Sequence, residues 1–215
     1  MNLTQDIAAA VYGAALGLAA LMNVTAASTE DALFAVMDRE LQVPYDAERG
    51  KHSHWKTCMT ARVPHDDTDP HGRCHARLRS LAALFVASGR EHGIDPWVLA
   101  AVSHRETRWN PWAEGAKGES GVMQLLGQAR RDPESGKLLR FYDPRRNKRC
   151  RREADECQAG VVQRAAQILA TGLVECGDIR GALYRYNSGR CAEHPNGYAD
   201  KVLRQAAEWR GGDDA

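Results

Sequence analysis

The sequence predicts a mainly α-helical protein, and three observations support this fold class. Apolar residues recur every three or four positions in several long stretches, which is the spacing of a helix with one buried face. No run alternates apolar and polar residues for long enough to indicate a strand. The chain has 215 residues, of which 43% are hydrophobic, and this is sufficient for one domain with a buried core.

The predicted helices are bounded by turn and capping residues. The first spans residues 76–90 and stops before Gly93. The second begins near Pro96, because Asp95 can cap a helix and proline is accepted in its first turn. It ends before Pro111, since the residue that precedes a proline avoids the helical conformation. Three further helices follow the same apolar spacing, over Asp155–Cys176, Ile179–Tyr186 and Tyr198–Trp209.

The N-terminal segment resembles a secretory signal peptide. Residues 7–24 are uncharged and rich in Ala, Leu and Gly, and small residues surround a cleavage point near Ala27. Asp6 and the lack of a basic residue before this run depart from the pattern, and a retained N-terminal anchor or a buried helix are the alternatives. We therefore expect export to the periplasm or cell envelope. The chain divides into a signal-like segment 1–27, a polar extension 28–76, a helical body 77–210 and a flexible tail 211–215.

The charge of the chain argues against nucleic acid as a partner. The 29 basic and 28 acidic residues nearly cancel, so any electrostatic attraction must be local. The densest basic run comprises Arg145, Arg146, Lys148, Arg149, Arg151 and Arg152. We interpret this run as a solvated loop, and a patch that attracts anionic wall or lipid groups is the alternative.

The six cysteines all lie beyond the signal-like segment, and an even number in an exported chain indicates disulfides. Chain order favours pairing Cys58 with Cys74, Cys150 with Cys157, and Cys176 with Cys191, which is one of about fifteen arrangements. The competing interpretation is a metal site, because histidines surround the first pair: His52, His54, His65, His71 and His75. The paired ligand spacing of a zinc site is missing, so we predict no metal and no cofactor.

A carboxylate continues the apolar stripe of the second predicted helix. The residues expected on this face are Leu99, Val102, Glu106 and Trp109. Burial and the negative end of the helix dipole would both raise the pKa of the Glu106 carboxyl. An acid that is protonated near neutral pH can donate the proton that cleavage of a glycosidic bond requires. Alternatively, Arg105 and Arg108 form surface ion pairs with Glu106 and lower its pKa.

Two further stretches combine turn residues with polar side chains. GAKGESGVMQLLGQ brings three glycines into one loop around Met123 and Gln124, where the backbone could approach a ligand closely. RYNSG ends a helix with Asn187 and Gly189. Taken alone, the first stretch is more simply a plain loop, and the second is a normal helix end whose tyrosines pack in the core.

Together and in this order, the motifs resemble the lytic transglycosylase family, whose soluble members have a lysozyme-like fold and cut peptidoglycan glycan strands. The matching segments are GIDPWVLAAVSHRETRWNP, GVMQL and RYNSG, with weaker similarity in GYADKVL and in YDP followed by CQAGVVQRAAQIL. The resemblance covers residues 77–205. It implies that residues 77–210 form a lysozyme-like catalytic domain with peptidoglycan as its partner, and we expect a monomer.

The resemblance implies that Glu106 is a single general acid and base. It would protonate the β-1,4 bond between N-acetylmuramic acid and N-acetylglucosamine. It would then take the proton of the muramyl C6 hydroxyl, which leaves a 1,6-anhydro end without using water. Thr107, which replaces the usual serine of the family, would orient Glu106. The residues implied to bind the sugar are Met123, Gln124, Tyr186, Asn187 and Tyr198.

Two alternatives stay open beside this activity. A lysozyme-type hydrolase on the same fold would use water, positioned by Glu114 or Glu119, and would give a product with a reducing end. A non-catalytic accessory of wall binding or of a secretion apparatus would keep the cleft and lack turnover.

Overall fold

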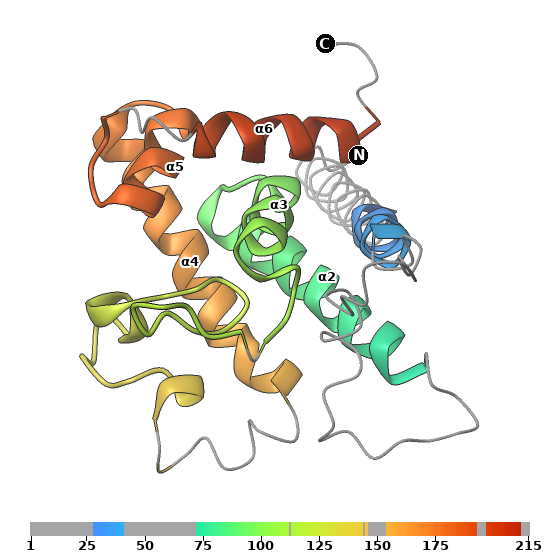
Figure 1. The fold of residues 1–215 in the computed structure, drawn as a ribbon, viewed down its shortest axis with the longest axis horizontal. Helices are drawn as coiled ribbons and strands as arrows, with labels where there is room; N and C mark the ends of the chain where they lie inside the picture. Colours follow the sequence, from blue (N-terminus) through green and yellow to red (C-terminus); the bar gives the residue numbers. More distant parts are fainter. Residues whose placement is uncertain are drawn as a thin grey trace, which may run out of the picture.

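The computed structural model describes residues 28–40, 72–111, 113–143, 145, 154–192 and 197–211 (Figure 1). Within these ranges the protein is mainly helical, as predicted, and contains isolated β-bridges but no strand. The helices are α2 (Gly72–His92), α3 (Pro96–Thr107), α4 (Ala154–Cys176), α5 (Ile179–Ser188) and α6 (Tyr198–Trp209), with short 3-10 helices η2 (Gly127–Arg130) and η3 (Arg140–Tyr142). Residues 28–40 form a further helix.

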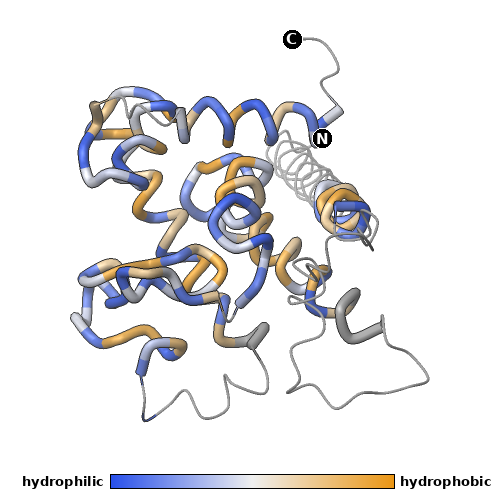
Figure 2. Tube along the Cα trace, viewed as in Figure 1, coloured by the Kyte–Doolittle hydropathy of each residue, from blue (hydrophilic) through white to orange (hydrophobic). Residues whose placement is uncertain are grey.

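The helix α3 lies at the centre of the arrangement (Figure 1). It packs against α2 and α6, while α4 packs against α2 and α5. Every residue from Trp97 to Ser103 is buried. Hydrophilic and hydrophobic positions alternate along α6 in Figure 2, as expected of a helix with one face against the core. The last turn of α3 therefore follows a segment of the helix that is packed in the core.

Local signals explain where α3 begins and ends. Asp95 accepts a hydrogen bond from the Trp97 amide at 3.0 Å, which confirms the predicted N-cap. The helix ends at Thr107, earlier than predicted, because Arg108 and Trp109 have left-handed backbone conformations with φ of 53° and 61°. The prediction that Trp109 continues the helix face is therefore wrong, although its side chain is fully buried.

The remaining predicted helices are all present, and most of their ends differ from the predicted ones. The bounds of α6 are those predicted, and α4 begins at Ala154 instead of Asp155. Likewise, α5 continues past Tyr186 to Ser188, and α2 begins at Gly72, before the predicted start at residue 76. Helix ends of this kind shift easily, because terminal turns have few hydrogen bonds to fix them.

The helix over residues 28–40 lies in the segment that the sequence analysis treats as a polar extension. Three of its apolar side chains are buried in the same core as the other helices: Leu33, Val36 and Met37. Trp209 Nε1 of α6 donates a hydrogen bond to Glu40 Oε1 at 3.3 Å. This part of the extension therefore belongs to the folded body.

The disulfide between Cys176 and Cys191 is present, as chain order predicts. It joins the end of α4 to the segment that follows α5. Cys157 is also disulfide-bonded. Its predicted partner Cys150 lies outside the described residues, as do Cys58 and the side chain of Cys74.

Several other predicted features also lie outside the described residues: the signal-like segment, the histidine-rich stretch and the basic run beyond Arg145. Arg145 itself is exposed. In the ranges that the structure covers, no helix has both the length and the apolar character to cross a membrane. In the same ranges, no three His, Cys, Asp or Glu side chains gather as ligands for a metal ion.

Candidate active site

Glu106 lies in the last turn of α3, and its side chain is half-buried. Oε1 of its carboxyl accepts a hydrogen bond of 2.6 Å from the hydroxyl of Tyr198, the first residue of α6. Tyr198 itself is buried, with 5% of its surface exposed. The carboxyl therefore has a fixed position between two helices and does not point freely into solvent.

The surroundings of Glu106 favour its protonated form. Burial is the largest influence and raises the pKa of the carboxyl above its ordinary value. The Tyr198 hydrogen bond and the positive charge of Arg105 lower this pKa, whereas the negative charge of Glu119 raises it. Since the net pKa is raised, burial outweighs the attraction of Arg105.

The helix α6 packs against α3, and the hydroxyl of its first residue, Tyr198, reaches Glu106. At the other end of the pair, Arg210 forms an ion pair with Asp95, which caps the start of α3. Three aromatic rings also pack together where α6 meets α3, with centroids 4.7–5.6 Å apart: His104, Trp109 and Trp209. Contacts along both helices therefore fix Tyr198 relative to Glu106.

Two hydroxyl groups of α3 attach the following loop to the end of the helix. Ser103 Oγ donates to the Val122 carbonyl at 3.0 Å. Thr107 Oγ1 lies 3.2 Å from the same oxygen and 3.1 Å from the Ser103 carbonyl. The Val122 amide donates to the buried Gln158 Oε1 of α4 at 3.1 Å. The Thr107 hydroxyl thus joins the end of α3 to the backbone of the loop, and its predicted role in orienting Glu106 stays a prediction.

Gln124 has a fixed amide orientation in this loop. Both protons of its Nε2 are used, because the atom donates to the carbonyls of Ala113 and Gly121 at 3.0 Å each. Its Oε1 faces Gly115 and would lie 3.0 Å from a Cβ at that residue. Gln124 thus presents an oriented acceptor, which suits an acetamido N–H or a hydroxyl.

Tyr186 of α5 joins the site from a third side. Its hydroxyl donates to the Met123 carbonyl at 2.6 Å. Burial, and then the negative charge of Glu106, raise the pKa of Tyr186 well above its ordinary value, so the phenol stays a donor. The Met123 side chain is fully buried, which differs from the exposed position expected of a sugar-binding residue. Asn187 follows Tyr186 and is exposed.

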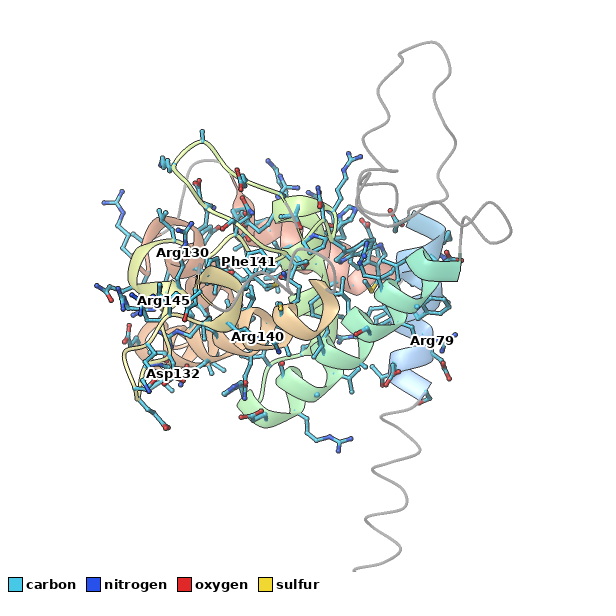
Figure 3. All side chains as sticks on the ribbon, turned by 90° about the horizontal axis from the view of Figure 1, so that it is seen from below. Arg79, Arg130, Asp132, Arg140, Phe141 and Arg145 are labelled. Carbon is cyan, nitrogen blue, oxygen red and sulfur yellow. A yellow bond between two sulfur atoms is a disulfide. The ribbon has the colours of Figure 1, made fainter. Side chains whose placement is uncertain are left out.

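The outer side of the loop is supported by the 3-10 helices. Arg130 of η2, labelled in Figure 3, donates to the carbonyls of Gly118 and, at 2.9 Å, of Leu125. Tyr142 of η3 donates to the Ser120 carbonyl at 2.7 Å. These bonds hold the loop from the side opposite to α3.

Four of the predicted site residues gather around the end of α3: Glu106, Gln124, Tyr186 and Tyr198. The sequence analysis missed Ser103 and Gln158, which anchor the loop, and considered Glu119 only as a water-positioning residue. Gln158 could have been found from the sequence, because it is a polar residue on the apolar face of α4. Nothing in the local pattern marks Glu119, because its position depends on how the loop turns.

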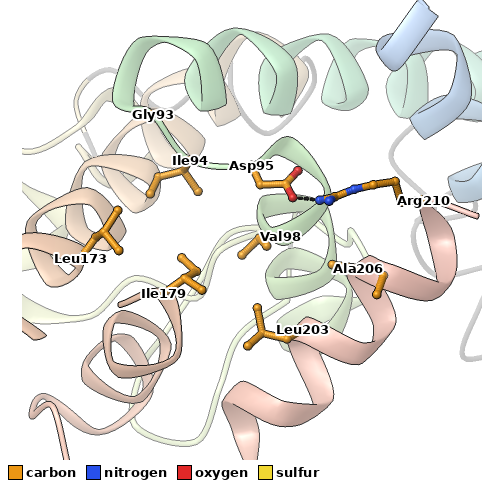
Figure 4. A pocket seen from close by; sticks show the side chains of 10 residues that line it. Gly93, Ile94, Asp95, Val98, Leu173, Ile179, Leu203, Ala206 and Arg210 are labelled. Atoms are coloured by element: carbon orange, nitrogen blue, oxygen red, sulfur yellow. Dashed lines mark ion pairs between the residues drawn. The ribbon is translucent and has the colours of Figure 1, made fainter. Parts of the chain in front are cut away.

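A separate pocket of about 340 Å³ lies at the other end of α3 (Figure 4). Its lining is mainly apolar, with Val98, Leu173 and Leu203 among the side chains, and the ion pair of Asp95 with Arg210 borders it. Since Asp95 precedes α3 and Glu106 lies in its last turn, this pocket is distinct from the candidate active site.

The chain was compared with models of known protein families, with curated proteins and with solved structures, and none of them matches it. The half-buried Glu106 carboxyl and the polar groups around it are therefore the basis for a chemical interpretation.

Proposed function

We propose that this protein is a lytic transglycosylase with a lysozyme-like helical fold, which cleaves the β-1,4 bond between N-acetylmuramic acid and N-acetylglucosamine in peptidoglycan. The main support is the environment of Glu106, a half-buried carboxyl with a raised pKa at the end of a buried helix. The order of motifs in the sequence supports the same activity. The proposal includes export to the periplasm or cell envelope, and its chemistry requires no cofactor.

In the proposed reaction Glu106 acts twice. As a carboxylic acid it donates its proton to the glycosidic oxygen, while the bond from that oxygen to the anomeric carbon breaks. As a carboxylate it then accepts the proton of the muramyl C6 hydroxyl, whose oxygen bonds to the anomeric carbon. The product carries a 1,6-anhydro ring, and no water is consumed. A raised pKa assists the first step, because more of the acid form is present near neutral pH.

The neighbours of Glu106 have supporting roles in this reaction. Tyr198 donates a hydrogen bond to the carboxylate that remains after the first proton transfer. Gln124 Oε1 is oriented to accept an acetamido N–H of the sugar. Tyr186 supports the loop through the Met123 carbonyl. Asn187, which is exposed, contributes a side-chain amide that can hydrogen-bond to the glycan.

A lysozyme-type hydrolase is the second candidate, and Glu119 is the observation that favours it. Its negative charge reaches Glu106, so a second carboxyl lies near the first, as in glycosidases that activate water. Glu114, the other residue expected to position water, is exposed. A non-catalytic wall-binding accessory is the remaining outcome, and it differs from both enzymes by the lack of turnover.

Digestion of purified peptidoglycan by the wild type and by Glu106→Gln tests the proposal. We expect the wild type to release 1,6-anhydro muropeptides, which mass spectrometry distinguishes because they lack one water relative to hydrolysis products. We expect Glu106→Gln to be about 10²–10⁴-fold slower, since it cannot donate or accept the proton. Glu134→Gln, which changes an exposed carboxyl, is the matched control and should retain wild-type activity.

Products with a reducing end would assign the hydrolase in place of the lytic transglycosylase. If the wild type binds sacculi and releases no fragments, and Glu106→Gln behaves in the same way, the accessory role replaces both enzymatic proposals.

A further inference from the structure

Glu119 is a half-buried carboxylate in the loop between α3 and η2, and its backbone and side chain both have fixed positions. The Gly115 amide donates to the Glu119 carbonyl at 2.8 Å, and the Lys117 amide donates to Glu119 Oε2 at 2.8 Å. Within the part of the chain that the structure describes, no basic side chain forms an ion pair with this carboxylate. Glu119 therefore holds a negative charge in a defined place.

Arg130 approaches this loop from η2, but its guanidinium is used for other contacts. It donates to the carbonyls of Gly118 and Leu125, and it lies over the ring of Tyr142 at 5.0 Å from the centroid. Arg130 thus supports the backbone of the loop and leaves the carboxylate of Glu119 to interact with a ligand.

Gly115 allows a second acceptor to lie beside this carboxylate. A Cβ built at residue 115 would stand 2.5 Å from Glu119 Oε2 and 3.0 Å from Gln124 Oε1, so both oxygens lie within 3.0 Å of one point. Gly115 is not among the residues with positive φ. Its contribution is therefore the absence of a side chain, which lets the two oxygens approach the same place.

Gln124 presents an oxygen that can only accept. Both protons of its Nε2 are donated to the carbonyls of Ala113 and Gly121 at 3.0 Å, which fixes the amide. Among the described residues, no donor reaches Gln124 Oε1. The loop thus offers a carboxylate and an amide oxygen together, and the complementary ligand group has several N–H donors and a positive charge.

We propose that Glu119 and Gln124 form a subsite for a primary ammonium group of the glycan substrate. An ammonium has three donors and a positive charge, whereas an acetamido group has one N–H donor and no charge. The inference rests on the proposed function for the choice of a glycan. Peptidoglycan can supply this group from N-deacetylated glucosamine or from a free amine of a stem peptide.

Calorimetric binding of two tetramers tests the first source: β-1,4-linked glucosamine and its fully N-acetylated form. Neither contains the bond that the proposed reaction cleaves, so binding is measured without turnover. In weakly acidic buffer, where the amines are protonated, we expect the wild type to bind the glucosamine tetramer about 10-fold more tightly, because charge-assisted hydrogen bonds are stronger than neutral ones.

A muropeptide monomer with a free stem-peptide amine tests the second source, in comparison with the same monomer after acetylation of that amine. A preference for the free amine in this pair alone would assign the ammonium to the stem peptide. A preference between the tetramers alone would assign it to the sugar. Equal binding within both pairs would overturn the proposal.

Four variants show which carboxylate carries the preference. Glu119→Gln keeps the size of the side chain and an acceptor for the Lys117 amide but removes the charge, so we expect the preference to be lost. Gly115→Ala keeps the charge and displaces the two oxygens, so we expect a smaller preference. Glu134→Gln removes an exposed carboxyl and should leave the preference intact. If Glu119→Gln does not fold, Gly115→Ala decides the question. A preference that survives in folded Glu119→Gln and is lost in Glu106→Gln would assign the ammonium to Glu106 and overturn the proposal.

Digestion of purified peptidoglycan separates this inference from the proposed function. If the wild type prefers the free amine, Glu119→Gln loses this preference and no peptidoglycan is cleaved, the ammonium subsite stands and the proposed function fails. If anhydro products form and the wild type binds the free and acetylated ligands equally, the proposed function stands and the subsite fails.

Discussion

At Glu106, burial and hydrogen bonding act on one carboxyl in opposite directions. Burial raises its pKa, and the Tyr198 hydroxyl, which donates at 2.6 Å, lowers it by stabilising the carboxylate. In the proposed reaction this carboxyl gives a proton and then takes one. Opposing influences suit both steps, because neither the acid nor the base form is strongly excluded.

Glu106→Gln is expected to stabilise the protein more at about pH 8 than at about pH 4. The raised pKa means that the folded protein favours the protonated carboxyl. The corresponding contribution to stability is complete below the unfolded-state pKa and is lost as the pH rises through the folded-state pKa. Glutamine stays neutral throughout and can still accept the Tyr198 hydrogen bond. Urea unfolding at both pH values should show a larger gain in the free energy of unfolding at the higher pH.

Glu134→Gln is the control for this pH dependence, because its carboxyl is exposed and should contribute little at either pH. A gain of equal size at both pH values in Glu106→Gln would contradict the prediction, since it would reflect packing and not ionisation.

Helical spacing was sufficient to predict that Glu106 lies near a buried face, because α3 is regular up to Thr107. It failed for Trp109, whose position follows from the left-handed backbone after the helix. It also could not show that the Met123 side chain is fully buried. Glu119 depends on a turn that folds back on itself, and such tertiary placement leaves no periodic signal in the sequence.

At the scale of elements, the loop between α3 and η2 uses two of its glycines for different reasons. Gly118 has a φ of 86°, and a Cβ added there would have no neighbour within 4 Å. Gly121 has a φ of 78°, and an added Cβ would stand 3.2 Å from a Phe141 ring atom and 3.3 Å from Gln158 Oε1. The first position needs only backbone freedom, whereas the second also needs space.

Gly121→Ala is therefore expected to destabilise the protein more than Gly118→Ala. The left-handed conformation should cost about 1–2 kcal/mol in either variant. Overpacking against α4 and η3 should add about 1–3 kcal/mol at residue 121. Urea unfolding of both variants measures the difference. Equal losses would show that the loop moves away from its neighbours without cost.

The helices were more predictable than the segments between them. Periodic apolar residues predicted the helices, and the capping residue Asp95 predicted the start of α3. The structure also shows a cap at the start of α5, where Asp178 Oδ1 accepts a hydrogen bond from the Gly181 amide at 2.6 Å. The helix over residues 28–40 was missed, because its few apolar residues stand next to a long polar stretch. The 3-10 helices depend on contacts such as those of Arg130, which local sequence does not reveal.

At the scale of the whole molecule, the candidate active site is assembled from segments far apart in the chain. Glu106 comes from α3, Gln124 from the following loop, Tyr186 from α5 and Tyr198 from α6. Apolar spacing shows which face of each helix is buried, but it does not show which helix covers it. For this reason the packing of α6 against α3 could not be predicted, whereas the disulfide between Cys176 and Cys191, which are neighbours among the cysteines of the chain, could.

Replacing both Cys176 and Cys191 by serine is expected to lower the free energy of unfolding by about 3 kcal/mol, the typical effect of closing a loop of this length. Because the loop contains α5, we also expect the proposed peptidoglycan cleavage to be lost at a lower temperature in the variant than in the wild type. Urea unfolding and activity after heating measure the two effects. A double variant as stable as the wild type would show that the packing of α5 alone holds this helix in place.

The bond between Cys176 and Cys191 has one more consequence for α5. Arg180 and Arg190 are exposed within the bridged segment, and a protease that recognises arginine cuts a chain after such residues. A single cut there would leave both pieces of the chain covalently attached. After such a cut, the disulfide would keep the helix that contains Tyr186 attached to the rest of the protein.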